Sequence, residues 1–237
     1  MIVLAVVAHP DDEVLGAGAT LARLAAEGHA VHILILAEGV SLRHGRLDLQ
    51  QARERCRRAG SILGAAQVSF GGFAVDGGLM ADAPSREVVA AVQKAIDAVG
   101  PQLVLTHHHG DIHADHRLTH HSVTYCTKAP ATASVRELLT FEVLSSTEQQ
   151  ASGAPFTPDT FVEVGAYLDV KCAAMQVYDD ECQPYPQARS IQGIRALAAV
   201  RGLHVAVHAA EAFATSRRLL GQQSPLPAHA AHAAQGG

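Results

Sequence analysis

The sequence is poor in the residue types that mark several protein classes. Its 237 residues contain no tryptophan and four cysteines, Cys56, Cys126, Cys172 and Cys182, which lie far apart and form no C-x-x-C pair. This spacing argues against a disulfide framework and is typical of reduced thiols. We therefore expect a cytoplasmic protein.

The chain also lacks an excess of positive charge and a long apolar run. Its formal net charge is −5 and its pI is near 6.3, so it has no basic surface suited to nucleic acid. The apolar run at residues 2–8 has no basic segment before it, and acidic residues follow almost at once. It is too short for a membrane span and unlike a signal peptide. We expect a small-molecule partner and no membrane span, and the number of subunits stays open, with a homo-oligomer among the options.

Apolar runs bounded by turn residues alternate with helical patterns along the first half of the chain. Buried strands separated by helices indicate a mostly parallel sheet covered on both faces, which is a three-layer α/β fold. We expect one domain over residues 1–221 and a flexible tail over 222–237. Strands are predicted at 2–8, 30–37, 67–70, 102–106, 136–144, 160–164 and 203–208, and helices at 14–27, 47–63, 85–99 (with Ser85 as N-cap) and 167–177.

Two polar motifs follow predicted strands. HPDDE at 9–13 comes directly after the first strand, and THHHGDIHADH at 106–116 begins where the strand at 102–106 ends. Ligands of such sheets bind beyond the carboxyl ends of the strands. The two motifs are therefore predicted to lie at the same edge of one sheet.

The first motif supplies two candidate metal ligands. Acidic residues after Pro10 would also favour a helix start without any ligand, so the motif alone is ambiguous. His9 and Asp12, three residues apart at a strand-to-helix turn, can point at one cation and leave Asp11 beside it. A catalytic zinc site needs three protein ligands, and His116 is the natural third.

Other residues of the second motif have further candidate roles. His113 is then free to act on a substrate, and Asp115 can orient an imidazole. His120 has an i, i+4 relation to His116, but Arg117 stands where the H-E-x-x-H zinc helix has glutamate. One or two of the adjacent histidines at 107–109 are expected to be bystanders. Fe²⁺ or Mn²⁺ could occupy the same two-His-one-carboxylate set as Zn²⁺.

AHPDDE at 8–13 together with D-x-H-x-D-H at 111–116 resembles the zinc-dependent N-acetyl-sugar deacetylases of the PIG-L/LmbE type. Weaker similarities lie in DGGL at 76–79, FEVLSST at 141–147, YLDVKCAAM at 167–175 and AAEAF at 209–213, so the resemblance spans nearly the whole chain apart from the tail. It implies that zinc binds through His9, Asp12 and His116, that Asp11 is the general base, and that His113, oriented by Asp115, stabilises the reacting carbonyl.

The resemblance also implies substrate contacts. Arg53 matches an arginine that holds substrate, although the register around RERCRR leaves Arg55 as the alternative. Asp76 matches a residue that binds sugar hydroxyls. Tyr178 stands where many relatives have histidine, and together with AAEAF and the short chain it favours the bacillithiol-pathway subgroup that deacetylates N-acetylglucosaminyl-malate.

The predicted function is metal-dependent removal of the acetyl group from an N-acetylglucosamine-type conjugate, which releases acetate and a free amine. Two alternatives belong to other classes. The predicted sheet is Rossmann-like, and GAGATL at 16–21 hints at a nucleotide-binding module, but G-x-G-x-x-G is absent. A non-catalytic metal- or sugar-binding protein is the second, and Asp11 argues against it because a binding site needs no unliganded base.

Overall fold

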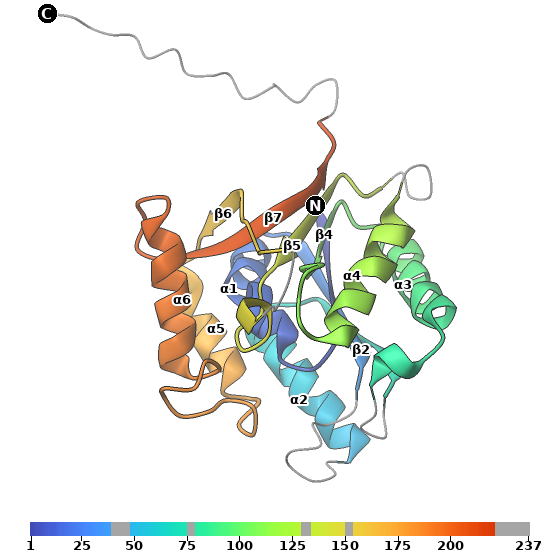
Figure 1. The fold of residues 1–237 in the computed structure, drawn as a ribbon, viewed down its shortest axis with the longest axis horizontal. Helices are drawn as coiled ribbons and strands as arrows, with labels where there is room; N and C mark the ends of the chain where they lie inside the picture. Colours follow the sequence, from blue (N-terminus) through green and yellow to red (C-terminus); the bar gives the residue numbers. More distant parts are fainter. Residues whose placement is uncertain (39–47, 75–78, 129–133, 150–153, 221–237) are drawn as a thin grey trace, which may run out of the picture.

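The computed structural model describes residues 1–38, 48–74, 79–128, 134–149 and 154–220. They contain one seven-stranded sheet (Figure 1), in which the first five strands pair in parallel and β7 runs antiparallel to both of its neighbours. The strand order is β3 (Gln67–Phe73), β2 (Ala30–Ala37), β1 (Ile2–Val7), β4 (Leu103–His107), β5 (Glu137–Phe141), β7 (Ala210–Arg218) and β6 (Thr160–Glu163). This confirms the predicted mostly parallel sheet.

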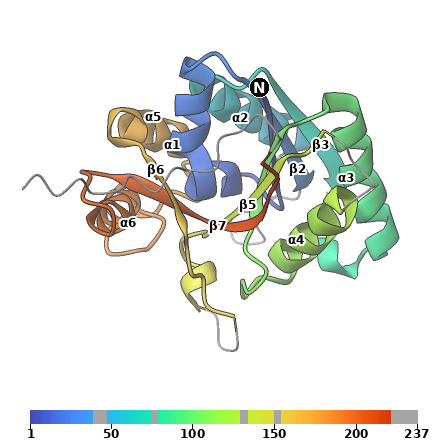
Figure 2. The ribbon, with the colours of Figure 1, turned by 90° about the horizontal axis from the view of Figure 1, so that it is seen from above.

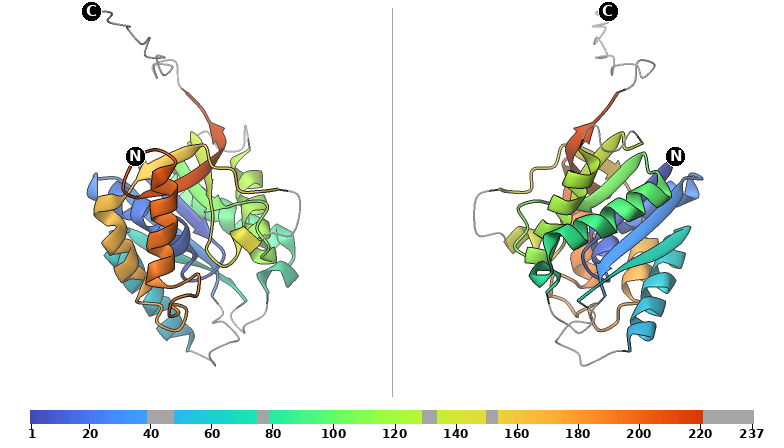
Figure 3. Two further views of the ribbon diagram at one scale, coloured as in Figure 1. Left: turned by 60° about the vertical axis from the view of Figure 1, so that its left-hand side comes forward. Right: turned by 90° about the vertical axis from the view of Figure 1, so that its right-hand side faces the viewer.

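Helices cover both faces of the sheet, as Figures 2 and 3 show. One face carries α1 (Asp12–Ala26), α2 (Leu49–Ile62), α5 (Leu168–Met175) and α6 (Ile191–Leu203), and the other carries α3 (Ser85–Val99) and α4 (Ala114–Thr127). Short 3-10 helices lie at Met80–Asp82 (η1), Thr147–Gln149 (η2) and Gly165–Tyr167 (η3). The fold is therefore the three-layer α/β architecture expected from the sequence.

The central strand β1 explains why its sequence is apolar throughout. Val3, Ala5 and Val7 belong to the hydrophobic core under α1 and α2, whereas Leu4, Val6 and Ala8 belong to the core under α3 and α4. Successive side chains of a strand point to opposite faces, so a strand covered on both sides needs an uninterrupted apolar run.

The glycines of GAGATL serve packing inside α1. A Cβ on Gly16 would lie 2.2 Å from the Phe141 ring, so only glycine lets α1 approach β5 this closely. These glycines stand within the helix, after its first turn, and do not form a loop at its N-terminus. The segment therefore lacks the turn geometry of a dinucleotide-binding fingerprint.

The strand predicted at 203–208 is wrong. Leu203 is the last residue of α6 and is 79% exposed, and the strand that follows is β7 at Ala210–Arg218. Helix α6 went unrecognised in the sequence, although Ser190 caps it by accepting a hydrogen bond from the Gly193 N–H at 2.9 Å. A short apolar run with exposed side chains resembles a strand in sequence, and only its packing distinguishes the two.

Most other boundaries differ from the expected ones by a few residues. Strand β3 extends to Phe73, and α3 begins at Ser85 with Pro84, not Ser85, as its N-cap. The tail at 222–237 and the expected first helical residue, Leu47, lie outside the described residues. Among the described helices, none is both long enough and apolar enough to cross a bilayer.

Candidate active site

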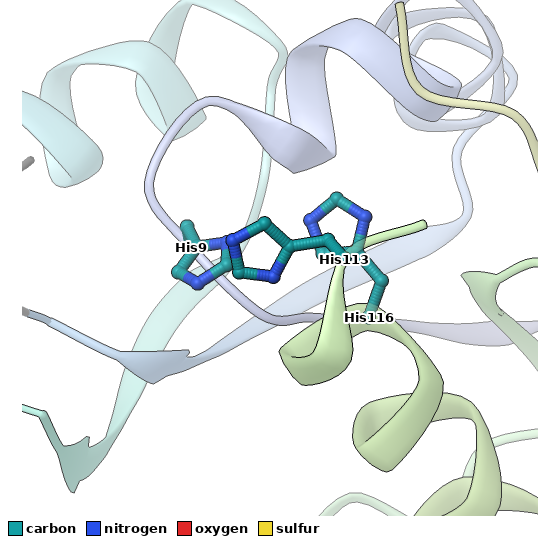
Figure 4. Close-up of side chains that lie close together, drawn as sticks. All are labelled: His9, His113 and His116. Atoms are coloured by element: carbon teal, nitrogen blue, oxygen red, sulfur yellow. The ribbon is translucent and has the colours of Figure 1, made fainter. Parts of the chain in front are cut away.

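The two polar motifs meet at the carboxyl ends of β1 and β4, which are parallel neighbours. His9 and Asp11 lie between β1 and α1, and His113 and His116 lie at the start of α4. Figure 4 shows the imidazoles of His9, His113 and His116 gathered at one place. The sequence prediction that both motifs share one edge of the sheet agrees with this geometry.

Asp12 is at the centre of the cluster. Its Oδ2 lies 3.3 Å from His9 Nδ1 and 3.3 Å from His116 Nε2, and it accepts a 2.8 Å hydrogen bond from the His9 N–H. The side chain is 1% exposed. Burial by itself would raise the pKa of Asp12, but the neighbouring His116 and His107 imidazoles lower it well below its usual value. Asp12 is therefore held as a carboxylate, with the imidazoles of His9 and His116 on either side.

The His9 and His116 imidazoles each have a second carboxylate on the nitrogen that does not face Asp12. His9 Nε2 lies 2.9 Å from Asp115 Oδ2, and His116 Nδ1 lies 3.1 Å from Asp111 Oδ2. Burial opposes protonation of both rings, yet the carboxylates raise the pKa of His9 to about 10 and that of His116 to about 9. Metal-binding histidines are commonly oriented in this way, by a carboxylate on the nitrogen that does not bind the metal.

The outer carboxylates are themselves held firmly. Asp115 accepts hydrogen bonds from the backbone N–H groups of Met80 (3.1 Å) and Ala81 (2.7 Å) at η1. Asp111 accepts from the hydroxyl groups of Ser146 and Thr147, the latter at 2.6 Å. Asp111 is the first residue of D-x-H-x-D-H, but its hydroxyl partners lie 35 and 36 residues away, so the sequence motif alone did not reveal its role.

His113 is the N-cap of α4. Its Nδ1 accepts a 3.2 Å hydrogen bond from the Asp115 N–H, so the neutral ring carries its proton on Nε2. Burial, and then the nearby His9 and His116, lower its pKa to about 4. The Asp115 carboxylate thus contacts His9, while Asp115 contacts His113 through its backbone.

Two overlapping groups of side chains offer ligand atoms that lie within 4.8 Å of one another. One is His9, His113 and His116, and the other is Asp12, His107 and His116. His107 Nε2 accepts the Ala8 N–H at 2.9 Å, which occupies its lone pair. The neutral His113 ring presents an Nε2–H, not a lone pair. His9, Asp12 and His116, the ligands predicted from the sequence, are divided between these two groups, with His116 in both.

His120 lies one turn beyond His116 and faces elsewhere. Its Nδ1 is 2.9 Å from the His107 carbonyl oxygen, and its Nε2 is 3.3 Å from Thr124 Oγ1. The described structure therefore gives His120 hydrogen-bond partners outside the Asp12 cluster.

Asp11 lies beside the cluster and is 1% exposed. Its φ of 93° is in the left-handed region, and its N–H bonds to Glu13 Oε2 at 3.1 Å. The Arg189 guanidinium contacts Asp11 Oδ2 at 2.9 Å, although 178 residues separate the two. Burial raises the pKa of Asp11 well above its usual value against the opposing charge of Arg189. Nothing in the sequence marked Arg189.

Of the predicted substrate-binding residues, the structure describes Arg53 and its alternative Arg55, both on α2. Arg53 forms an ion pair with the buried Glu38 at the end of β2, and its guanidinium stands 5.2 Å from the Phe70 ring centre. Arg55 instead contacts Asp180, at 2.8 Å. Asp76 lies outside the described residues. The structure thus pairs Arg53 of α2 with the residue that follows β2, and pairs Arg55 with the segment after α5.

Tyr178 is buried beneath the first turn of α1. Its hydroxyl donates a 2.7 Å hydrogen bond to Glu13 Oε1, and the tyrosine is 3% exposed. Burial raises the pKa of Glu13 to about 7, although Tyr178 opposes the shift. This pair supports the loop that carries Asp11 and Asp12.

Residues 4–127 match the protein-family model PIG-L, described as GlcNAc-PI de-N-acetylase. The chain is 31% identical over 180 residues to YaiS, an uncharacterized deacetylase of Escherichia coli K12, and the match covers 73% of this chain and 88% of that relative.

Solved structures share the fold over most of the chain. The conserved protein TT1542 of Thermus thermophilus has a TM-score of 0.73 and 26% identity, covering 94% of this chain and 98% of that one. The hydratase GalB of Pseudomonas putida has a TM-score of 0.73 and 23% identity, and the match covers 93% of this chain and 98% of that one. The N,N'-diacetylchitobiose deacetylase of Pyrococcus horikoshii has a TM-score of 0.72 and 18% identity, with 90% of this chain and 83% of that one covered. The latter two, below 25% identity, support the fold alone. The family model and the E. coli relative show that this chain belongs to the PIG-L family of de-N-acetylases.

Proposed function

We propose that this protein hydrolyses the N-acetyl amide of an N-acetylglucosamine-type conjugate and releases acetate and a free amine. The observation that carries the proposal is the pair of aspartates at the end of β1. Asp12 lies between two imidazoles as a ligand would, while its neighbour Asp11 has no imidazole among its described ion pairs. A site for binding alone needs the first carboxylate and not the second.

The donor set suits a divalent metal ion. His9 Nδ1 and His116 Nε2 each lie 3.3 Å from Asp12 Oδ2, which brings two nitrogens and one oxygen together, and both imidazoles have a carboxylate on their other nitrogen. Three such ligands are typical of catalytic zinc, and Fe²⁺ or Mn²⁺ accept the same set. A bound ion would act as a Lewis acid and make a water molecule more acidic at neutral pH.

Asp11 is the proposed general base. Its carboxylate accepts a proton from water as the oxygen attacks the amide carbon, and a C–O bond forms while the carbonyl π bond opens to an oxyanion. Asp11 then returns the proton to the amide nitrogen as the C–N bond breaks. Acetate and the amine leave, and Asp11 is again a carboxylate.

His113 is the proposed oxyanion donor. The hydrogen bond from the Asp115 N–H to Nδ1 favours the neutral ring with its proton on Nε2. A neutral imidazole N–H can stabilise an oxyanion as it forms. Asp115 contributes through the first turn of α4, which aims this ring, and through its carboxylate on His9.

The amino-sugar substrate is supported by the family to which the chain belongs. The matching family is described as GlcNAc-PI de-N-acetylase, whose substrate is a GlcNAc conjugate. Arg53, which lies on α2 and pairs with Glu38, and Asp76 are the proposed sugar contacts. Tyr178 matches the N-acetylglucosaminyl-malate subgroup, but its hydroxyl donates to the buried Glu13. Its proposed role is therefore to support the loop that carries Asp11 and Asp12, and not to contact the substrate.

A free-amine assay tests the proposal. The purified protein, loaded with Zn²⁺, Fe²⁺ or Mn²⁺ or treated with a chelator, is incubated with a panel of N-acetylglucosaminides that includes N-acetylglucosaminyl-malate and diacetylchitobiose. We expect metal-dependent release of equal amounts of acetate and amine from at least one of them. Stoichiometric metal with no hydrolysis of any member would favour a non-catalytic binding protein.

A further inference from the structure

Arg189 joins three segments at the side of the proposed base. Its Nη1 donates to Asp11 Oδ2 at 2.9 Å and to Glu181 Oε2 at 3.0 Å, and its Nε donates to Ser145 Oγ at 2.8 Å. It stands one residue before Ser190, the N-cap of α6. One planar group therefore connects the loop after β1 with the loop after β5 and the segment before α6.

The contact with Asp11 is shielded from solvent. The Asp11 side chain is 2% exposed and that of Arg189 is 21% exposed, so Arg189 covers the carboxylate and reaches the surface itself. Within the part of the chain that the structure describes, Arg189 is the one cation in ion-pair contact with Asp11.

The backbone of Asp11 is held separately from its side chain. The carbonyl oxygen of Asp11 accepts from the N–H groups of Val14 (3.0 Å) and Leu15 (2.9 Å), and its N–H bonds to Glu13. These bonds fix the strained loop that starts α1. The Asp11 carboxylate, by contrast, is bonded by Arg189.

We propose that Arg189 is a positioning residue for Asp11. By binding Oδ2, the guanidinium directs Oδ1 as the atom that exchanges the proton with water and with the leaving amine. A lysine cannot reproduce this role, because its single ammonium group lacks the planar fork that bonds Asp11, Glu181 and Ser145 together. This inference rests on the proposed function, since it gives Arg189 no part if Asp11 is not the base.

The decisive experiment is a double-mutant cycle on kcat with Asp11→Asn and Arg189→Ala. Misplacing a reacting group by about 1 Å can cost about 100-fold in rate, so Arg189→Ala should lower kcat by roughly that factor while KM changes little. In the Asp11→Asn background the same substitution should cost little more, because the group it positions no longer accepts a proton. Guanidinium chloride at millimolar concentration should restore part of kcat to Arg189→Ala but not to the double mutant.

Two further readouts separate positioning from a structural role. Zinc affinity, measured by competition with a chromogenic chelator, should match wild type in Arg189→Ala, because Arg189 contacts no proposed ligand. Arg195→Ala is the matched control, since it removes an arginine that pairs with Asp169 on the surface, and it should keep wild-type kcat. Arg189→Lys provides a folded variant if Arg189→Ala melts early, and it should show the same loss of kcat.

Several results would overturn the inference. Wild-type kcat in both Arg189 variants would remove the role outright. Losses that multiply in the double mutant, or a rise in KM alone, would assign Arg189 to substrate binding independent of Asp11. A wild-type protein that hydrolyses nothing in the panel would instead refute the proposed function itself, which is a separate outcome.

Discussion

Replacing Asp115 by asparagine should weaken metal binding through His9. The carboxylate lies 2.9 Å from His9 Nε2 and also accepts two backbone N–H groups from η1. Asparagine keeps the shape and one acceptor oxygen, so the hydrogen bond from the Ala81 N–H to Oδ1 and the fold should persist, while the Met80 N–H loses its acceptor. The negative charge behind the imidazole is lost, and removal of such a partner typically lowers metal affinity about 10–100-fold. That corresponds to about 1.4–2.8 kcal/mol of binding free energy.

Competition with a chromogenic zinc chelator measures this change directly. Asp97→Asn is the control, because Asp97 is exposed on α3 and bonds to Gln93 within the same helix. We expect the control to bind zinc like the wild type, and Asp115→Asn to bind more weakly with kcat partly retained at saturating metal. Unchanged zinc affinity combined with a large fall in kcat would refute this reasoning and would return Asp115 to a role on His113 alone.

The remaining predictions concern the ligands and the base. Asp11→Asn should lower kcat by roughly 10²–10⁴-fold while zinc content stays near wild type, and a mutant that loses zinc would show that Asp11 is a ligand. His116→Ala should lose stoichiometric metal on dialysis whereas His120→Ala should retain it, and the reverse result would move the third ligand to His120. Because the carboxylates raise the pKa of His9 to about 10 and that of His116 to about 9, both rings of the metal-free protein are protonated at neutral pH. Metal uptake must then release about two protons and become tighter as the pH rises towards 9, which calorimetry in buffers of different ionisation enthalpy would detect; release of none would contradict the assigned protonation.

The sequence predicted the parts of the molecule that depend on short-range pattern. Continuous apolar runs such as Ile2–Val7 indicated strands buried on both faces, and the helices between them implied a parallel sheet. That topology alone placed HPDDE and the histidine motif at one edge, because parallel strands end on the same side. The i, i+3 relation of His9 to Asp12 was readable for the same reason.

Other features depended on contacts between distant segments. The sequence predicted that Asp115 orients His113, whereas in the structure its carboxylate lies against His9 and accepts the Met80 N–H of η1. The segment at 203–208 resembled a strand because a run of six residues does not indicate whether its apolar side chains are buried or exposed.

The sequence by itself determined the fold class, the shared edge and the residue types that can hold a metal ion. The tertiary structure decided which nitrogen of each imidazole faces Asp12, which histidine uses its lone pair on the backbone, and that Arg189 lies against Asp11. The physical reason is the distance along the chain over which each kind of interaction acts. Periodicity and local spacing act over a few residues and are written in the sequence, whereas the Arg189–Asp11 pair spans 178 residues and exists only once α6 packs against the sheet.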